Sequence, residues 1–346
     1  MKKKRTPTHH SRSPTLGNVA EAAGVSTATV SRVINKPDAV RPEMRRRVQD
    51  QIDALGYVPD GAARALASRR TKTVGAVIPT LASAIFADGM DGFETELGMA
   101  GYTLLLATSG YDAGQEVKHV TTLIERGVDG ILLVGKDHDA VIFDLLDRRH
   151  VPYVITWAHV GNGVHPSVGF DNAGAAYRMA GHLLELGHTA FAMIAGITDG
   201  NDRAIERVQG TREALAAQGL VIAPDCILER DYDIAAGREA ARQLMCLANP
   251  PTAIICGNDV LAVGAVLECA AAGIDVPGQV SIVGFDDLPL AAHLTPSLTT
   301  MHVPSEEMGR RAASYLMATL NGKETPSTQE LNVELIVRGT SGPPPT

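Results

Sequence analysis

The stretch that decides the fold of the first part of the chain is Thr15-Leu-Gly-Asn-Val-Ala-Glu-Ala-Ala-Gly-Val-Ser-Thr-Ala-Thr-Val-Ser-Arg-Val-Ile-Asn35. Thr15 is placed to cap a first short helix, and Gly24 can supply the positive φ with which such a helix ends. Ser26 is placed to cap a second helix. Two short helices joined by a tight turn around a glycine form a helix-turn-helix, so the stretch predicts a unit that binds DNA.

The second helix of this unit is expected to lie in the major groove, with its N-terminal residues facing the base edges. Its outward residues are Thr27, Ala28, Ser31 and Arg32. Thr27 and Ala28 are small and suit thymine methyl groups or water-mediated contacts. Two roles stay open for Arg32, which is long enough either to pair with a guanine or to clamp a phosphate.

A third helix is expected to begin at Pro42, since proline is favoured in the first turn of a helix. Its apolar residues recur at helical spacing and are expected to pack on the first two helices; they are Met44, Val48, Ile52 and Leu55. Residues 45–47 are all arginine and lie on the outer side. There they either contact phosphates or form a solvated face.

Charge separates the two ends of the chain. Residues 1–70 are rich in Lys and Arg although the whole chain has a net charge of −8, so the remainder is strongly acidic. A basic end on an acidic body favours a polyanion as the partner of the first segment, although a solvated basic tail has the same composition. Residues 1–14 are also rich in Pro and Ser, and we expect them to form a disordered arm.

Several classes of protein are disfavoured. The basic start is followed by Thr, Pro, His and Ser rather than by an apolar run, so we expect no export, and no stretch of about 20 apolar residues is present to span a membrane. The four cysteines match neither metal-ligand pairs nor a redox motif. The enzyme motifs GxxxxGK[ST], GxSxG and HExxH are missing. We therefore expect a cytoplasmic protein that is not an enzyme, with no catalytic residues, no metal site and no cofactor.

From Thr73 onward, apolar runs alternate with helical segments such as 115–126 and 173–186. Continuous apolar strands that alternate with helices indicate parallel sheets covered on both faces. The runs fall into two sets, which predict an α/β body of two lobes, and ligands of such folds bind beyond the carboxyl ends of the strands. The predicted strands are Val74–Pro79, Thr103–Ala107, Gly130–Val134, Val151–Thr156, Ala190–Ala195, Ala253–Cys256 and Val280–Phe285.

The N-terminal motifs resemble those of the LacI/GalR family of bacterial repressors. The family pattern AxxAGVSxxTVSRxxN is found at residues 20–35, the LGYxP element at Leu55–Pro59 and the hinge element AxxLA at Ala63–Ala67. The body resembles the periplasmic-binding-protein-like effector domain of the same family. The tracts that carry this second resemblance are Val168–Asn172, Gly257–Ala265, Pro277–Asp287 and Pro296–Thr300.

The resemblance implies a hinge helix that forms only against a partner, with Leu66 inserted as a wedge into the minor groove. Without that role, Leu66 is a plain helix-packing residue. Asn18 stands where the family usually has an acid, which is expected to weaken the capping box with Thr15, and Arg41 replaces a small capping residue. Gly61 lies inside the hinge helix and should destabilise it by about 0.5–1 kcal/mol relative to Ala.

Together these patterns predict five segments: a disordered basic arm (1–14), a helix-turn-helix headpiece (15–58), a hinge helix and linker (59–70), a two-lobed effector-binding and dimerisation domain with parallel sheets (71–340) and a disordered tail (341–346). The family topology implies three crossings between the lobes, near residues 158–170, 287–297 and 320–330. The candidate DNA-binding residues are Thr15, Ser26, Thr27, Ala28, Thr29, Ser31, Arg32, Asn35, Ala63 and Leu66.

Effector contacts of the family carry over where the motifs match. An arginine and carboxylates can bind vicinal hydroxyls, while an aromatic ring can cover the apolar face of a ligand. Other roles stay open: a surface ion pair for Arg207, a turn for Asp286, and core packing for Tyr232 or Trp157. The candidate effector-binding residues are Ser83, Phe86, Lys136, Trp157, Arg207, Tyr232, Asp259 and Asp286.

The chemistry of the effector is a separate hypothesis. Lys136, His138, His159 and Arg207 would make the cleft cationic, unless Lys136 and the histidines are solvent-facing loop residues. The tracts 81–86 and 168–172 also resemble the gluconate-responsive branch of the family. A sugar acid is therefore our hypothesis, ahead of a neutral sugar or a purine.

The resemblance implies a homodimer, because two headpieces are needed to read a palindromic operator in double-stranded DNA. Effector binding would close the cleft, shift the lobes and either order or release the hinge helices. Inducer and corepressor roles both stay open, although the family favours an inducer that releases a repressor. An architectural DNA-binding protein would instead bind without sequence preference or ligand response.

Overall fold

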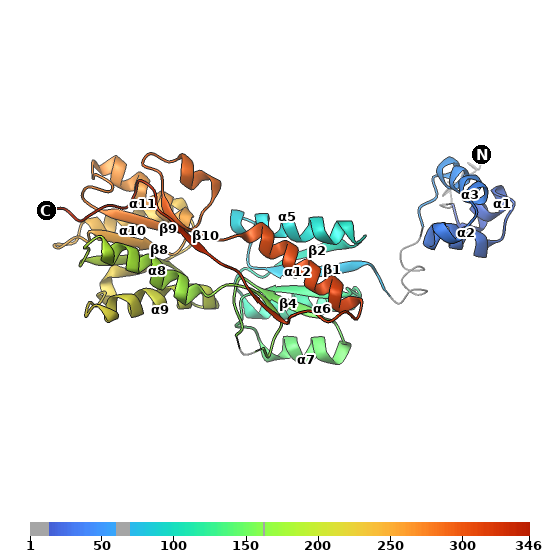
Figure 1. The fold of residues 1–346 in the computed structure, drawn as a ribbon, viewed down its shortest axis with the longest axis horizontal. Coiled ribbons are helices and arrows are strands. Elements are labelled where there is room, and N and C mark those ends of the chain that lie inside the picture. Colours follow the sequence, from blue (N-terminus) through green and yellow to red (C-terminus); the bar gives the residue numbers. More distant parts are fainter. Residues whose placement is uncertain (1–13, 60–69, 162) are drawn as a thin grey trace, which may run out of the picture. The chain divides into compact units, whose positions relative to one another are not determined.

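The computed structural model describes residues 14–59, 70–161 and 163–346. The chain divides into two compact units, Met1–Thr71 and Lys72–Thr346 (Figure 1). The predictions for residues 1–13 of the arm and for Gly61, Ala63 and Leu66 of the hinge lie outside the described residues.

In the first unit, the described residues form three α-helices around a small apolar core (Figure 1). Helix α1 (Leu16–Ala22) and helix α2 (Thr27–Asn35) are joined by a turn at Gly24, where φ is +62°. Helix α3 (Pro42–Leu55) follows the 3-10 turn η1 (Pro37–Ala39). The predicted helix-turn-helix is confirmed. Its buried side chains are Val19, Ala20, Ala23, Val30, Val33, Val48 and Tyr57.

The start of α1 is capped more completely than the sequence predicts. The N–H of Asn18 donates to Oγ1 of Thr15 at 3.3 Å, and the N–H of Thr15 donates to Oδ1 of Asn18 at 2.9 Å. The expected weakening of this capping box is wrong, because the amide oxygen of Asn18 accepts as a carboxylate oxygen would. Helix α2 is capped as predicted, with Oγ of Ser26 accepting from the N–H of Thr29 at 3.2 Å.

The end of α3 corrects a second expectation. Leu55 is 37% exposed and does not join the core. The helix ends at Gly56, where φ is +60°, and the N–H of Tyr57 donates to the carbonyl of Ile52 at 3.0 Å. This turn brings the ring of Tyr57 into the core, where it takes the place expected for Leu55.

The second unit contains two six-stranded sheets in its described residues. Lobe 1 has the strand order β11-β5-β4-β3-β1-β2, and lobe 2 has the order β12-β10-β9-β8-β6-β7. Neighbouring strands are parallel except for β10 and β12, which are antiparallel. The strands of lobe 1 are β1 (Thr73–Ile78), β2 (Thr103–Thr108), β3 (Gly130–Val134), β4 (Tyr153–Thr156), β5 (Ser167–Gly169) and β11 (Thr328–Glu330). Those of lobe 2 are β6 (Phe191–Gly196), β7 (Ile227–Arg230), β8 (Ala253–Cys256), β9 (Ser281–Asp286), β10 (Thr299–His302) and β12 (Glu334–Ile336).

Helices cover both faces of each sheet (Figure 1). In lobe 1, α5 (Ala84–Met99) and α12 (Ser305–Leu320) cover one face of the sheet, and α6 (Ala113–Glu125) and α7 (Ala140–Arg149) cover the other. Val74, Ala76 and Ile78 of β1 belong to the apolar cluster under the first pair, whereas Val77 belongs to the cluster under the second pair. In lobe 2, α8 (Asn172–Glu185) and α9 (Asp202–Ala217) cover one face of the sheet, and α10 (Ile234–Met245) and α11 (Asp259–Ala272) cover the other. This lobe also contains two 3-10 turns, η2 (Pro224–Cys226) and η3 (Pro289–His293). The predicted two-lobed α/β fold is confirmed.

In the described residues the chain crosses between the lobes three times, and one crossing lies elsewhere than expected. The first, at residues 170–171, overlaps the end of the predicted range. The second is at 303–304 rather than 287–297, because η3 and β10 keep the intervening chain in lobe 2. The third, at 331–333, directly follows the predicted range 320–330, since β11 first pairs with β5 in lobe 1.

The C-terminal residues correct the expectation of a disordered tail. Oγ of Ser341 lies 2.9 Å from Oγ1 of Thr299, and the carbonyl of Gly342 accepts from Oγ of Ser281 at 3.0 Å. These contacts fix the start of the tail on β9 and β10. Within the described ranges, no helix is long and apolar enough to cross a membrane.

Candidate functional site

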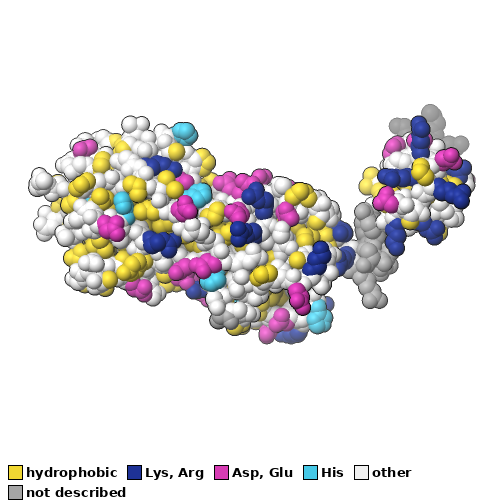
Figure 2. Space-filling model, viewed as in Figure 1, with side chains coloured by type: hydrophobic (Ala, Val, Ile, Leu, Met, Phe, Trp, Pro, Cys, Tyr) yellow, Lys and Arg dark blue, Asp and Glu magenta, His cyan; other side chains and the backbone are white. Residues whose placement is uncertain are grey.

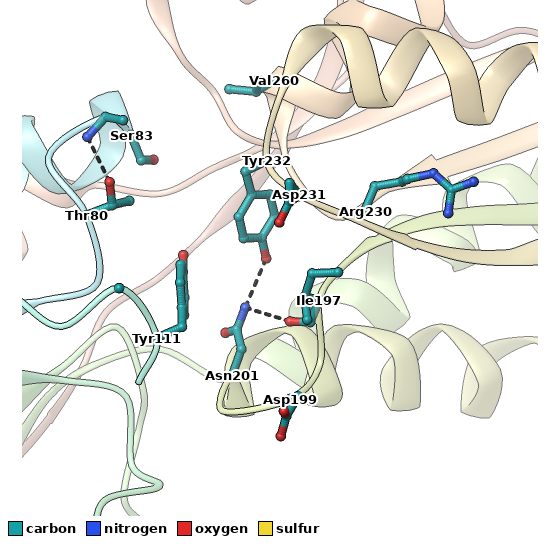
Figure 3. Close-up of a pocket in the computed structure, with 12 residues that line it drawn as sticks. Thr80, Ser83, Tyr111, Ile197, Asp199, Asn201, Arg230, Asp231, Tyr232 and Val260 are labelled. Carbon is teal, nitrogen blue, oxygen red and sulfur yellow. Dashed lines mark hydrogen bonds between the residues drawn. The ribbon is translucent and has the colours of Figure 1, made fainter. Parts of the chain in front are cut away.

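Strands β1 and β2 of lobe 1 and β6 and β7 of lobe 2, at one side of each sheet, end at a shared cavity of about 470 Å³ (Figure 3). Lobe 1 contributes the loops after β1 and β2, and lobe 2 contributes the loops after β6 and β7 and the start of α11. This is the place where open parallel sheets bind ligands. The residues that line the cavity are Thr80, Ala82, Ser83, Gly110, Tyr111, Ile197, Asp199, Asn201, Arg230, Asp231, Tyr232 and Val260.

Two tyrosines from opposite lobes face each other in this cavity (Figure 3). The ring centroids of Tyr111 and Tyr232 are 6.5 Å apart and the rings are inclined by 43°. The side-chain amide of Asn201 donates to the hydroxyl of Tyr232 at 3.3 Å and to the carbonyl of Ile197 at 3.2 Å. Gly196 is required beside this hydroxyl, since a Cβ there would collide with the Tyr232 side chain. The cavity therefore combines aromatic faces with hydrogen-bonding groups.

Of the candidate effector-binding residues, the structure brings Ser83 and Tyr232 to the cavity lining. It does not bring Phe86 or Trp157 there. Phe86 is 5% exposed and Trp157 is 2% exposed, and their rings pack edge to face with centroids 5.1 Å apart. Trp157 lies against Gly89 of α5, so that helix encloses both rings in the core of lobe 1. Core packing, the alternative for Trp157, is what the structure shows.

Arg207 is buried in lobe 2, which excludes a surface ion pair. Its Nε donates to Oδ1 of Asn172 at 3.0 Å, and its Nη1 donates to the carbonyl of Gly257 at 2.7 Å. The guanidinium also lies 3.6 Å from the centroid of the Phe285 ring and 4.0 Å from Oδ1 of Asp286. Arg207 thus holds α9, β9 and the loop after β8 together.

Asp259 and Asp286 are two buried carboxyl groups in the same lobe. Asp259 accepts from the hydroxyl of Thr300 at 2.5 Å and from the N–H of Leu288 at 2.7 Å. Burial, followed by repulsion from Asp286, raises the pKa of Asp259 to about 8. Burial raises the pKa of Asp286 to about 7 although the charge of Arg207 opposes this shift. Near neutral pH the carboxyl group of Asp259 is therefore largely protonated.

The cations expected to make the cleft positive are matched by acids. Nζ of Lys136 forms an ion pair with Glu206, and its backbone N–H donates to Asp202 at 2.6 Å. Nδ1 of His138 lies 2.9 Å from a carboxylate oxygen of Glu116. Burial lowers the pKa of His138, but the hydrogen bond and charge of Glu116 outweigh burial and raise it overall. His159 is not among the lining residues. The cationic-cleft hypothesis is therefore not supported at these positions.

A second cavity of about 290 Å³ shares Tyr111 with the first cavity as a lining residue. Its lining includes Glu116 and His138 of lobe 1 and Asp202 and Arg203 of lobe 2. Nη1 of Arg203 donates to Oδ1 of Asp202 at 2.7 Å, so this cation also has an acidic partner.

In the headpiece, the candidate DNA-binding residues form the open side of α2. Ser26, Thr27, Ala28, Arg32 and Asn35 are exposed, while Thr29 and Ser31 are half-buried and Thr15 is exposed at the start of α1. The amide of Asn35 donates to Oγ of Ser31 at 3.2 Å. Figure 2 shows Lys and Arg side chains gathered over this unit, which suits a polyanionic partner.

Comparison with known proteins identifies the family. Residues 15–60 match the model described as bacterial regulatory proteins, lacI family, and residues 180–341 match the periplasmic binding protein-like domain. The HTH-type transcriptional repressor PurR of Photobacterium profundum is 32% identical, over 94% of this chain and 97% of its own length. The chain belongs to the LacI family of bacterial regulatory proteins.

Solved structures of transcriptional regulators are similar to this chain in fold and in part of the sequence. The transcription regulator GntR of Chromobacterium violaceum has a TM-score of 0.74 and 30% identity, over 78% of this chain and 99% of its own. The lac repressor dimer bound to operator and the anti-inducer ONPF has a TM-score of 0.84 and 25% identity, over 95% and 99%. This LacI-family chain is a DNA-binding transcriptional repressor with an effector domain, and it is not an enzyme.

Sequence reasoning did not identify Tyr111, Asn201, Arg230 or Val260 of this LacI-family cleft. Tyr111, Asn201 and Val260 follow the ends of strands at the shared cavity, and Arg230 is the last residue of β7. The position after a strand was the signal available for Asn201 and Val260, which follow predicted strands β6 and β8. Strand β7 was not predicted, so Arg230 had no such signal.

Proposed function

We propose that this repressor binds a palindromic operator as a homodimer and that a sugar or sugar acid in the shared cavity changes its affinity for that operator. The observation that carries the effector proposal is the pair of tyrosines that face each other in a cavity of about 470 Å³. A volume of this size is typical of small-molecule sites.

The lining matches the surface of a polyhydroxylated ligand. The ring of Tyr111 or Tyr232 can cover the apolar face of a sugar, whereas Ser83, Asn201 and Asp231 can exchange hydrogen bonds with its hydroxyls. Arg207, Asp259 and Asp286 support this site from within lobe 2. In this proposal Phe86, Trp157 and Lys136 act only by positioning the loops around the cavity.

A sugar acid would need a cation, and among the lining residues that cation is Arg230. Its Nη1 donates to the carbonyl of Glu229 and its Nη2 to the side chain of Gln243, each at 2.9 Å, and it remains half-exposed. Asp199 and Asp231 also line the cavity and disfavour a second anion. The resemblance of tracts 81–86 and 168–172 to the gluconate-responsive branch supports the sugar acid.

The DNA half of the proposal assigns the operator contacts to the headpiece and hinge. Thr27, Ala28 and Arg32 would face base edges, and Ala63 and Leu66 would act in the minor groove. A palindrome requires two headpieces, and the lac repressor, to which this chain is similar, is described as a dimer bound to operator. Such a regulator works in the cytoplasm, where the operator lies.

The effector class is tested on the full chain by thermal unfolding with D-glucose, D-gluconate and hypoxanthine. A ligand at about 100 times its dissociation constant should stabilise the protein by about 2.7 kcal/mol. If gluconate stabilises the wild type and not Arg230→Ala, the sugar-acid proposal stands; Arg148→Ala, an exposed arginine of α7, is the control. Stabilisation by glucose in both forms would favour a neutral sugar, and stabilisation by hypoxanthine alone would contradict the proposal.

A further inference from the structure

Tyr111 has a backbone conformation that is unfavourable for a bulky residue. Its φ is +63°, directly after Gly110 at +65°. Left-handed conformations are outliers for large side chains, and residues held in them concentrate at functional sites. His150 is also left-handed, at φ +53°, but it ends helix α7, where this conformation is ordinary. Tyr111 ends no helix.

The loop of Tyr111 is held closely against the other lobe. Gly200 of lobe 2 has φ +65°, and a Cβ at this glycine would lie 2.7 Å from the carbonyl oxygen of Tyr111. Only a residue without a side chain fits there without displacement. The position of the Tyr111 ring is therefore set by contacts from both lobes.

Tyr111 lines two spaces. One is the cavity of about 470 Å³ that contains Tyr232, and the other is the cavity of about 290 Å³ beside His138 and Arg203. At 6.5 Å between centroids, the two tyrosines are within the range of direct ring contact. Burial, followed by the neighbouring Tyr232, raises the pKa of the Tyr111 hydroxyl, so it stays neutral and can donate a hydrogen bond.

We infer that Tyr111 is a specificity-determining residue, whose ring divides the space between the lobes and limits the effector to a molecule of monosaccharide size. This inference rests on the proposed function of the cavity. A single sugar unit covers the face of Tyr232 and reaches the hydroxyl of Tyr111. A second unit extending toward the other cavity meets the ring of Tyr111, which its tight loop holds in place.

The inference is tested with Tyr111→Asn in the full chain. Asparagine accepts the left-handed conformation and removes the ring, so the two cavities join without new backbone strain. Tyr111→Phe keeps the dividing ring, and His150→Asn makes the same kind of exchange at a left-handed position of α7. Calorimetric titration with D-glucose, D-gluconate and cellobiose measures the preference of each variant.

The wild type and His150→Asn should bind a six-carbon probe and not cellobiose. Tyr111→Phe, which loses the hydroxyl that the sugar reaches but keeps the ring, should bind that probe more weakly and still exclude cellobiose. Tyr111→Asn should bind that probe about ten-fold more weakly and should gain binding of cellobiose. Cellobiose binding by the wild type, or unchanged binding of all probes by Tyr111→Asn, would overturn the inference. If the wild type binds neither six-carbon probe, the proposed effector class fails. In that case, cellobiose binding gained by Tyr111→Asn would still support a ring that divides the space, and no gain of cellobiose binding would overturn this inference. Tyr111→Gly, which also accepts this φ, replaces Tyr111→Asn if the latter does not fold.

Discussion

The guanidinium carbon of Arg207 lies 3.6 Å from the centroid of the Phe285 ring. Phe285 in turn stacks on Phe170, with centroids 6.1 Å apart. Phe170 occupies the first crossing between the lobes, and Phe285 belongs to β9. A buried stack therefore connects the arginine of α9 to the segment that must bend when the lobes move.

Arg207→Ala should lower the free energy of unfolding by about 3–5 kcal/mol, because Asp286 would remain buried without its cation. Chemical denaturation of the full chain measures this loss. The matched control is Arg148→Ala, whose partner is Asp144 and whose ion pair is exposed, with side-chain exposures of 73% and 67%. The control should change stability by less than about 1 kcal/mol. An equally small loss for Arg207→Ala would show that its contacts do not stabilise lobe 2.

Stability should fall with rising pH through the carboxyl group of Asp259. Its folded pKa of about 8 lies above the unfolded value, so the native state binds the proton more tightly. The resulting stabilisation is complete below about pH 4 and is lost as pH rises through about 8, by at most about 1.4 kcal/mol per pH unit. Asp259→Asn, which mimics the protonated group, should have a flatter pH profile in thermal unfolding than the wild type.

The exposed acid Asp225 supplies the control for this profile. Asp225→Asn should leave the pH dependence of unfolding as it is in the wild type, since this carboxylate is solvated. A profile for Asp259→Asn that parallels the wild type would contradict the assignment of the proton to this site.

Two glycines in helices should respond oppositely to alanine. At Gly309 of α12 a Cβ would collide with the carbonyl oxygen of Gly89, so Gly309→Ala should force α12 away from α5 and destabilise lobe 1. A Cβ at Gly181 of α8 meets nothing within 4 Å. Gly181→Ala should therefore stabilise the protein by about 0.5–1 kcal/mol. Melting temperatures that move in the same direction for both variants would refute this packing argument.

Arg32→Ala separates the two roles left open for this exposed side chain. If Arg32 reads a base, operator binding should weaken by about 1–3 kcal/mol and one base pair should lose its preference. If it contacts a phosphate, the slope of log affinity against log salt should become less steep by about 0.9. Fluorescence anisotropy with a DNA sequence selected from a random pool measures both quantities. Unchanged binding would remove Arg32 from the interface.

The local sequence pattern was sufficient to predict the strands that are buried on both faces of a sheet. Strands β1, β3 and β9 are continuous apolar runs, so their existence follows from the sequence. Strands β5, β7, β10, β11 and β12 were not predicted. Each of them has only three or four residues, and most of these residues are polar or only partly buried. Pairing with distant parts of the chain defines such strands, as between Thr300 of β10 and Ile336 of β12.

The site shows the same division. Tyr232 and Ser83 could be placed at the cavity because the family motif and the strand end mark them. Tyr111 lies in a Gly-Tyr-Asp turn, and only the packing of two lobes brings its ring to Tyr232. Phe86 and Trp157 have the chemistry of ligand contacts, but the close approach of α5 at Gly89 directs them to the core.

We expect occupation of the cavity between the lobes to control operator binding. The most direct measurement is the affinity of the full chain for its selected operator, by fluorescence anisotropy, in the presence and absence of the six-carbon probe that stabilises it. We predict that the probe changes the operator affinity of the wild type. Without the probe, Tyr232→Ala should bind the operator as tightly as the wild type does, and the probe should leave the operator affinity of this variant unchanged. An operator affinity that does not respond to the bound probe, or an equal response in Tyr232→Ala, would contradict the account.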